Sequence, residues 1–84
     1  MITVKLFGTL RLNSGVKVLT INASSLKKMY EPLYIEITRI NPEPGFTLKE
    51  LKSCLVAVNG KRAGKNIRLY PGDEVCILSS AGGG

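Results

Sequence analysis

The sequence predicts a small α+β domain in which a β-sheet packs on one main helix. Three observations support this prediction. Apolar side chains alternate with others near the N-terminus, apolar residues recur with helical spacing over residues 26–40, and short apolar runs separated by turn residues fill the last third of the chain. A length of 84 residues suits one hydrophobic core and is too short for two. We therefore expect a single folded domain.

The first part of the chain is typical of a β-hairpin. Residues 2–8 alternate with a period of two and stop at a glycine, which predicts a first strand. Residues 13–15 (Asn-Ser-Gly) have the composition of a turn, and the β-branched and apolar residues of 16–21 predict a second strand. Residues 1–22 are therefore expected to form a hairpin.

The main helix is predicted to begin after Ser24 or Ser25, either of which offers an N-cap oxygen. The apolar residues that follow share one helical face: Leu26, Met29, Tyr30, Leu33, Ile37 and Ile40. Pro32 removes a backbone hydrogen bond and clashes with the preceding turn, at about 3 kcal/mol, so we expect a kink or a break near Glu31. The alternative, a strand over residues 33–37, leaves two of these apolar residues unexplained, and we favour the helix.

A second, short helix is expected after the main one. Residues 41–45 (Asn-Pro-Glu-Pro-Gly) end the preceding element. Thr47 and Glu50 have the spacing of a capping box, which predicts a brief helix that starts next to Thr47.

Three further strands complete the predicted order β-β-α-β-β-β. Residues 55–58 are continuously apolar, which is typical of a buried central strand, and an Asn-Gly turn pair closes them. Ile67 and Leu69 indicate a short edge strand, and residues 74–78 form the last strand after a Pro-Gly-Asp turn.

Composition excludes several classes of function. The chain has no histidine, which removes the commonest general base and zinc ligand, so we expect neither independent catalysis nor a metal site. The longest apolar run, residues 54–58, is far below the roughly 20 residues of a membrane span, and Lys5 interrupts the N-terminal run that a signal peptide would need. Cys54 and Cys76 are interpreted as reduced core thiols. These observations predict a cytoplasmic protein without a membrane segment.

Basic residues outnumber acidic ones by 12 to 6, which gives a net charge of +6. Four of them lie close together and could contact phosphates: Lys61, Arg62, Lys65 and Arg68. Glycine and asparagine interrupt this cluster and no aromatic residue is interleaved, so a solvated loop is favoured over an RNA contact. An acidic protein partner would account for the charge equally well.

The last residues, 79–84, read Ser-Ser-Ala-Gly-Gly-Gly. Consecutive glycines bury no side chain and lose the most backbone entropy on ordering, so this segment is expected to be a flexible tail outside a folded domain of residues 1–78. Without Cβ atoms it could enter a narrow tunnel and carry a terminal carboxylate to a remote active site. The alternative is a frayed end without a function.

Four segments in this order resemble the ubiquitin-like β-grasp sulfur carriers, and most of all the small subunit of molybdopterin synthase, the MoaD type, with the thiamin sulfur carrier ThiS as a relative. They are residues 4–11 (VKLFGTLR), 56–60 (VAVNG), 69–75 (LYPGDEV) and 81–83 (AGG). The resemblance covers nearly the whole chain and implies a ubiquitin-like β-grasp fold, with a mixed β-sheet on one main helix.

The resemblance also implies that partners perform the chemistry. An ATP- and Mg²⁺-dependent activating enzyme would adenylate Gly84, and a sulfur donor would convert the acyl-adenylate to a thiocarboxylate. The large catalytic subunit of molybdopterin synthase would then receive the tail, Gly82, Gly83 and Gly84, and pass the sulfur to a pterin precursor. The chain itself would bind no cofactor.

Partner binding is expected on an exposed apolar patch near the tail, because a flexible end cannot fix its own register. By resemblance the candidates are Phe7, Leu69 and Leu78, for which ordinary core packing is the alternative. Arg11 matches the Leu-Arg pair of the family's N-terminal motif and could bond a partner carboxylate; a surface arginine without a role is the alternative.

Other functions remain open from the sequence. The same fold and tail suit a ubiquitin-like modifier that is conjugated to lysines through its C-terminal glycine, or a thiamin-type sulfur carrier. A third class is a β-grasp RNA-binding module that uses the basic cluster of residues 61–68.

Overall fold

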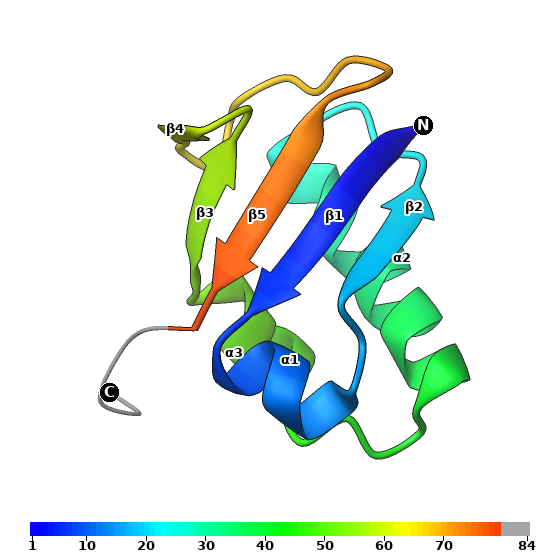
Figure 1. Cartoon of the computed structure of the whole chain (residues 1–84). Coiled ribbons are helices and arrows are strands. Elements are labelled where there is room, and N and C mark those ends of the chain that lie inside the picture. Colours follow the sequence, from blue (N-terminus) through cyan, green and yellow to red (C-terminus); the bar gives the residue numbers. More distant parts are fainter. Residues whose placement is uncertain (80–84) are drawn as a thin grey trace.

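A computed structural model, which describes residues 1–79, shows a five-stranded mixed sheet with helix α2 (Leu26–Ile40) across one face (Figure 1). The sheet order is β2-β1-β5-β3-β4. Its strands are β1 (Ile2–Phe7), β2 (Val18–Ile21), β3 (Leu55–Val58), β4 (Lys61–Arg62) and β5 (Glu74–Leu78). The central strands β1 and β5 are parallel, and the other neighbours are antiparallel. The predicted α+β class is confirmed.

Strands β1 and β5 lie at the centre of the sheet, and their side chains alternate between a buried face and a partly exposed face. The side chains turned toward the helices are at most 2% exposed: Ile2, Val4, Leu6, Val75 and Ile77. The intervening side chains, such as Lys5 and Cys76, lie on the outer face, which no helix covers (Figure 1). The two strands therefore join the core to an open surface.

The segment expected to be a hairpin turn contains a short helix, α1 (Thr9–Ser14). β1 and β2 are antiparallel neighbours as predicted, but the simple hairpin is wrong, and the second strand begins later than expected. The Ser14 hydroxyl donates to the carbonyl of the buried Leu10, and Gly15 ends the helix in the left-handed conformation, with φ at 74°. The N-cap, Gly8, has no side chain that could signal a helix start.

Helix α2 runs as one helix through Pro32, so the expected break near Glu31 is wrong. Ser25 is the N-cap, and its hydroxyl accepts a hydrogen bond from the Lys28 amide at 3.2 Å. Five of the six predicted apolar positions are buried, and Ile40 is exposed at the helix end. Burial of five large side chains, at about 1.5–3 kcal/mol each, outweighs the roughly 3 kcal/mol cost of the proline.

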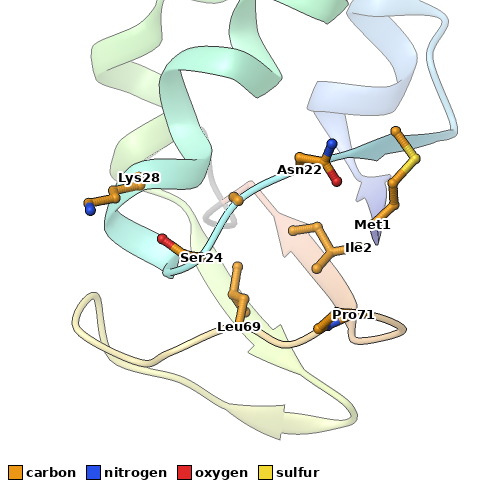
Figure 2. A pocket seen from close by; sticks show the side chains of 8 residues that line it. Met1, Ile2, Asn22, Ser24, Lys28, Leu69 and Pro71 are labelled. Atoms are coloured by element: carbon orange, nitrogen blue, oxygen red, sulfur yellow. The ribbon is translucent and has the colours of Figure 1, made fainter.

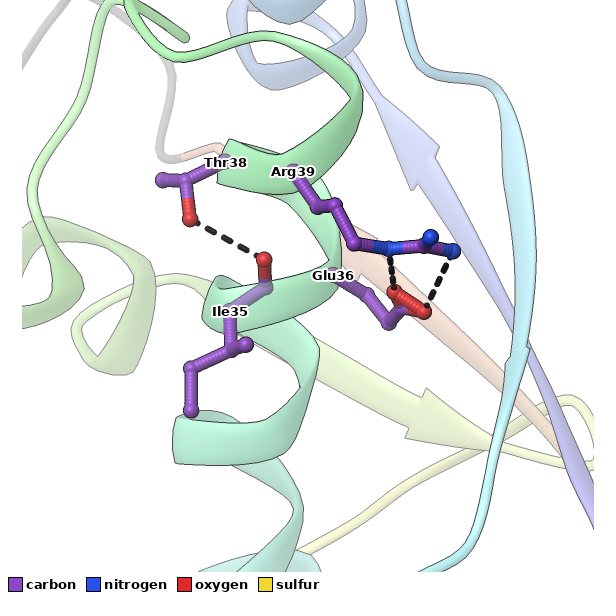
Figure 3. A network of polar contacts seen from close by, with 4 residues as sticks. All are labelled: Ile35, Glu36, Thr38 and Arg39. Atoms are coloured by element: carbon purple, nitrogen blue, oxygen red, sulfur yellow. Dashed lines mark hydrogen bonds and ion pairs between the residues drawn. The ribbon is translucent and has the colours of Figure 1, made fainter.

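The exposed side of α2 carries local polar contacts (Figure 3). Arg39 donates through Nε and Nη2 to the two carboxylate oxygens of Glu36, at 2.9 and 3.0 Å. The Thr38 hydroxyl donates to the Ile35 carbonyl at 3.0 Å, one turn away. These contacts stay within the helix.

Helix α3 (Leu48–Lys52) has the predicted capping box. The Glu50 amide donates to Thr47 Oγ1 at 3.1 Å, and the Thr47 amide donates to Glu50 Oε1 at 3.0 Å. The next strand, β3, has its predicted bounds, but Leu55 is 43% exposed while Val56 and Val58 are buried. The prediction that it is buried on both faces is wrong, because no helix covers the outer face of the sheet.

The edge strand expected at Ile67 and Leu69 is not among the strands of the described residues, where β4 takes its place beside β3. This segment instead runs beside the start of α2. The Leu26 amide donates to the Ile67 carbonyl at 2.9 Å, and the Leu69 amide donates to the Ser24 carbonyl at 3.0 Å. The loop after β4 is therefore held against the helix and not against the sheet edge.

Candidate functional site

An apolar groove of about 380 Å³ lies on the outer face of the sheet, at the end where β1 and β5 finish. Its lining residues are Phe7, Leu55, Val56, Ala57, Arg62, Cys76 and Leu78. Phe7 is 37% exposed, Leu55 43% and Leu78 47%. The strand register places Leu78 between the other two, with Phe7 beside it in β1 and Leu55 beside it in β3. Three strands thus present one continuous apolar surface.

Two of the three apolar residues predicted to bind partners, Phe7 and Leu78, line this groove. Leu69 does not, and the prediction that it shares their surface is wrong. It is 4% exposed and packs at the opposite end of the sheet, where it lines a different pocket with Ile2 and Pro71 (Figure 2). Its backbone bond to Ser24 holds it there.

Arg11 is exposed on α1 and is not among the residues that line the groove. Sequence reasoning missed Leu55 and Arg62. The apolar run predicts that Leu55 is buried. In a strand with one open face, however, alternate residues point outward, and Leu55 then lies on the same face as Ala57. Arg62 was grouped with neighbouring basic residues, and only its pairing with Ala57 across β3 and β4 brings it to the groove.

The other end of the sheet is polar, and its side chains are paired within the chain. Lys5 Nζ lies 3.1 Å from Glu74 Oε2. Asn59 Nδ2 donates to Asp73 Oδ1 at 3.0 Å, and the Glu74 amide donates to Asn59 Oδ1 at 2.9 Å. The Tyr70 amide donates to Asp73 Oδ2 at 2.8 Å. The Tyr70 bond first, and then the Asn59 bond, lower the pKa of Asp73, so that it stays ionised.

Cys76 lies on the outer face in the middle of β5, where it lines the groove. Burial, and then the charge of Glu74, raise the pKa of its thiol, and burial with the charge of Glu50 does the same for Cys54. Both cysteines are free. Both thiols are therefore protonated at neutral pH. Cys54 packs against the core as predicted, but the core assignment of Cys76 is wrong, because its side chain lies on the outer face of the sheet.

Ser79 fixes the point at which the chain leaves the sheet. Its hydroxyl accepts a hydrogen bond from the amide of Thr9, the first residue of α1, at 3.0 Å. Gly8 makes this approach possible, because a Cβ atom there would lie 2.6 Å from Ser79 Oγ, and its φ of +63° suits glycine. The exit point is therefore at the apolar end of the outer face, next to Phe7 and Leu78.

The predicted tail residues Gly82, Gly83 and Gly84 lie outside the described residues, and their roles stay predictions. Within residues 1–79, no group of three or more potential ligands could hold a metal ion. No helix among these same residues is long and apolar enough to cross a membrane.

No protein-family model and no curated protein matches the chain. Solved structures do. A chain of the BexX/CysO complex from Amycolatopsis orientalis superposes with a TM-score of 0.70 at 20% identity, over 100% of both chains. Small archaeal modifier protein 1 from Methanosarcina acetivorans gives 0.67 at 23% identity, over 99% of this chain and 95% of its own.

A third structure comes from the complex of subunits 1 and 2 of the molybdopterin-converting factor of Helicobacter pylori. One of its chains superposes with a TM-score of 0.65 at 24% identity, over 99% of this chain and 97% of its own. Identities this low establish a fold and not a particular role. At that level the prediction is confirmed: the chain has a ubiquitin-like β-grasp fold.

Proposed function

We propose that this chain is a sulfur carrier whose C-terminal glycine, Gly84, becomes a thiocarboxylate that donates sulfur in molybdopterin synthesis. The observation that carries the proposal is the apolar groove beside the exit of the chain at Ser79. A partner that docks on Phe7, Leu55 and Leu78 has the start of the tail within reach. Docking and delivery then depend on the same end of the sheet.

The groove has the chemistry of a protein docking surface. Its large side chains are apolar and partly exposed, and Arg62 adds one cation beside them. A complementary partner would insert apolar side chains and place a carboxylate near Arg62, because a guanidinium forms paired hydrogen bonds with a carboxylate. Two of the similar chains come from protein complexes, which supports a partner of this kind.

The proposed reaction starts from a carboxylate, which is a poor acyl donor. An activating enzyme lets the Gly84 carboxylate attack the α-phosphorus of ATP in the presence of Mg²⁺, and pyrophosphate leaves. A persulfide sulfur from a donor protein then attacks the carbonyl carbon, and AMP leaves. A thiol cleaves the resulting acyl disulfide, which releases the thiocarboxylate and forms a disulfide on the donor side. The large subunit of molybdopterin synthase finally receives the tail and takes the sulfur.

Intact-mass spectrometry tests this proposal directly. The chain is incubated with ATP, Mg²⁺, an activating enzyme of the adenylating class and a sulfur source. We expect the mass gain that corresponds to the replacement of one oxygen by sulfur. A variant without Gly83 and Gly84 should show no gain and an unchanged melting temperature, and Gly83→Val should block the gain by its bulk. If the truncated variant still supported molybdopterin synthesis in a complementation assay, the carrier function would be refuted.

A ubiquitin-like modifier is the second candidate function. The likeness to small archaeal modifier protein 1 favours it, since that chain shares the fold over almost its whole length. In this case the activated Gly84 would form an amide with a lysine of another protein. Lysine-linked conjugates that disappear when Gly83 and Gly84 are deleted would favour the modifier, whereas a thiocarboxylate on the free chain alone would favour the carrier.

A further inference from the structure

A second surface, on the helix side of the sheet, gathers basic residues from three segments. The loop after β4 is bonded to the start of α2 through Leu26 and Leu69, and it brings Lys65 close to Lys27. Lys52, at the end of α3, completes the group. These three lysines and Tyr30 line a pocket of about 170 Å³, to which no acidic residue contributes. The fold thus assembles a cluster that the sequence does not show.

Tyr30 is the one lining residue of this pocket that is not a lysine. Its side chain belongs to the core, and the residue is only 3% exposed. Tyr34 donates its hydroxyl to the Phe46 carbonyl, but the Tyr30 hydroxyl has no such partner among residues 1–79. Every fully buried polar side-chain atom of these residues has a partner, so the Tyr30 hydroxyl must keep contact with solvent, and the pocket is where Tyr30 meets it.

The hydroxyl is suited to donate a hydrogen bond to an anion. Burial, and then the charge of Cys54, raise the pKa of Tyr30, so that the phenol keeps its proton at neutral pH. A buried hydroxyl gains from a bond to a charged acceptor more than from a bond to a neutral one. The pocket therefore offers one fixed donor and three mobile cations.

The charge of the three lysines is not neutralised within residues 1–79. The ion pairs there are Lys5 with Glu74 and Arg39 with Glu36. Glu31 lies one helical turn after Lys27 but forms no ion pair with it in this part of the chain. Lys28 and Arg68, which line another pocket at the start of α2, add further positive charge. Lysines that line one pocket repel one another, and a bound anion would relieve that repulsion.

We propose that this pocket binds the phosphate group of a small phosphorylated ligand, with Lys27, Lys52 and Lys65 supplying the charge and Tyr30 a hydrogen bond. The volume of about 170 Å³ corresponds to roughly six water molecules of the liquid. That space fits the five heavy atoms of a tetrahedral oxyanion and leaves the rest of the ligand in solvent. The site lies away from the groove and from Ser79, so it does not depend on the proposed carrier function.

A nuclear magnetic resonance titration of the full chain tests the site. Inorganic phosphate is added at constant ionic strength, with chloride as the reference anion, and we expect saturable shifts at the amides of Lys27, Tyr30, Lys52 and Lys65. The triple variant K27Q/K52Q/K65Q should bind phosphate at least about tenfold more weakly, because it removes the charge-assisted hydrogen bonds of all three lysines. Absence of saturable shifts in the unmodified chain would overturn the proposal.

A matched control separates a built site from general positive charge. The variant K17Q/K49Q/K61Q removes the same charge from exposed lysines that do not line the pocket. It should bind phosphate within about twofold of the unmodified chain, because screened charges at a distance contribute little. An equal loss of affinity in both triple variants would show diffuse attraction and overturn the proposal.

Tyr30→Phe keeps the buried ring and removes only the hydroxyl. It should weaken phosphate binding by about threefold to tenfold, since one hydrogen bond is worth about 0.5–1.5 kcal/mol, while the amide spectrum stays that of a folded domain. Unchanged affinity would remove Tyr30 from the site. A single-stranded RNA oligomer is the last probe: if RNA binds, both triple variants weaken it equally and phosphate alone gives no saturable shifts, the basic residues attract nucleic acid diffusely and the single-phosphate site is refuted.

Discussion

The two ends of the sheet differ in the side chains of their outer face, which are polar at one end and apolar at the other. Where β5 begins, Glu74 pairs with Lys5, and Asp73 accepts bonds from Asn59 and Tyr70. Where β5 ends, Leu78 is 47% exposed beside other exposed apolar side chains. The polar side chains at the first end are paired within the chain, whereas the apolar side chains at the second end are partly exposed. In the proposed function, the second end is the one that binds a partner.

Strand β5 shows this division within five residues. Its inward side chains, Val75 and Ile77, are both fully buried and do not differ in character. Its outward side chains change from the charged Glu74 through Cys76 to the apolar Leu78. Successive residues of a strand face opposite sides of the sheet. The inward side chains of β5 can therefore all be apolar, while its outward side chains change from charged to apolar along the strand.

The largest effect is expected from a charge on the inward face. Val75→Asp places a carboxylate where the side chain is fully buried, without a partner that could pair with it. We expect a loss of about 3 kcal/mol or more in the free energy of unfolding, which is enough to unfold a marginally stable domain. Urea denaturation followed by circular dichroism measures it. A midpoint near that of the unmodified chain would contradict the inward assignment of Val75.

The same substitution three residues later should affect binding and spare the fold. Leu78→Asp on the open face should change the free energy of unfolding by less than about 1 kcal/mol, as is usual for exposed positions. It should weaken binding to the adenylating enzyme that the proposed function requires by at least about thirtyfold, because central apolar contacts at interfaces are worth about 2 kcal/mol or more. Thr20→Asp, on the exposed surface of β2, is the control for added charge, and titration calorimetry measures both. Equal effects of the two substitutions would remove Leu78 from the interface.

The polar end should respond to acid. Because hydrogen bonds lower the pKa of Asp73 in the folded state, its contribution to stability is present above its unfolded pKa, about 3.9, and is lost as the pH falls through the folded value. Asp73→Asn should therefore destabilise the domain at neutral pH, and the difference from the unmodified chain should shrink below about pH 4. Urea denaturation over this range measures it. A difference that stays constant down to low pH would show that the ionised carboxylate is not responsible.

The smallest effect is expected at the exit point. Ser79→Ala removes the hydrogen bond to the Thr9 amide, which should cost about 0.5 kcal/mol because the bond is exposed to solvent. Hydrogen exchange at Thr9 should accelerate, while exchange in the centre of β1 stays unchanged. Gly8→Ala is the companion variant, since its Cβ would displace the Ser79 hydroxyl. If the Thr9 amide exchanged equally in all three chains, Ser79 would not anchor the end of the sheet.

The elements that local signals specify could be predicted from the sequence. Ser25 and the apolar face of α2, the capping box at Thr47, and strand β5 all follow from residues a few positions apart. Helix α1 could not be predicted, because its N-cap is a glycine and the side chain that bonds its first amide is Ser79, 70 residues away. A contact between residues so far apart cannot be predicted from the pattern of neighbouring residues in the sequence.

The candidate site follows the same rule. Phe7 and Leu78 were candidates through the family resemblance, and the structure places both of them on the groove. The prediction for Leu69 is wrong because the sequence does not show whether an apolar residue before the last strand faces the groove or the core. In the structure, its backbone hydrogen bond to Ser24 holds Leu69 in the core. Arg62 was missed for the converse reason, since it reaches the groove through strand pairing.

The hydrogen bond between Ser79 and Thr9 joins the segments that follow strands β5 and β1. Since β1 and β5 run parallel, the turn after Phe7 and the step after Leu78 emerge side by side. A protein that binds residues 6–8 would therefore also lie next to Ser79. Two segments that are about 70 residues apart in the sequence thus form one continuous surface.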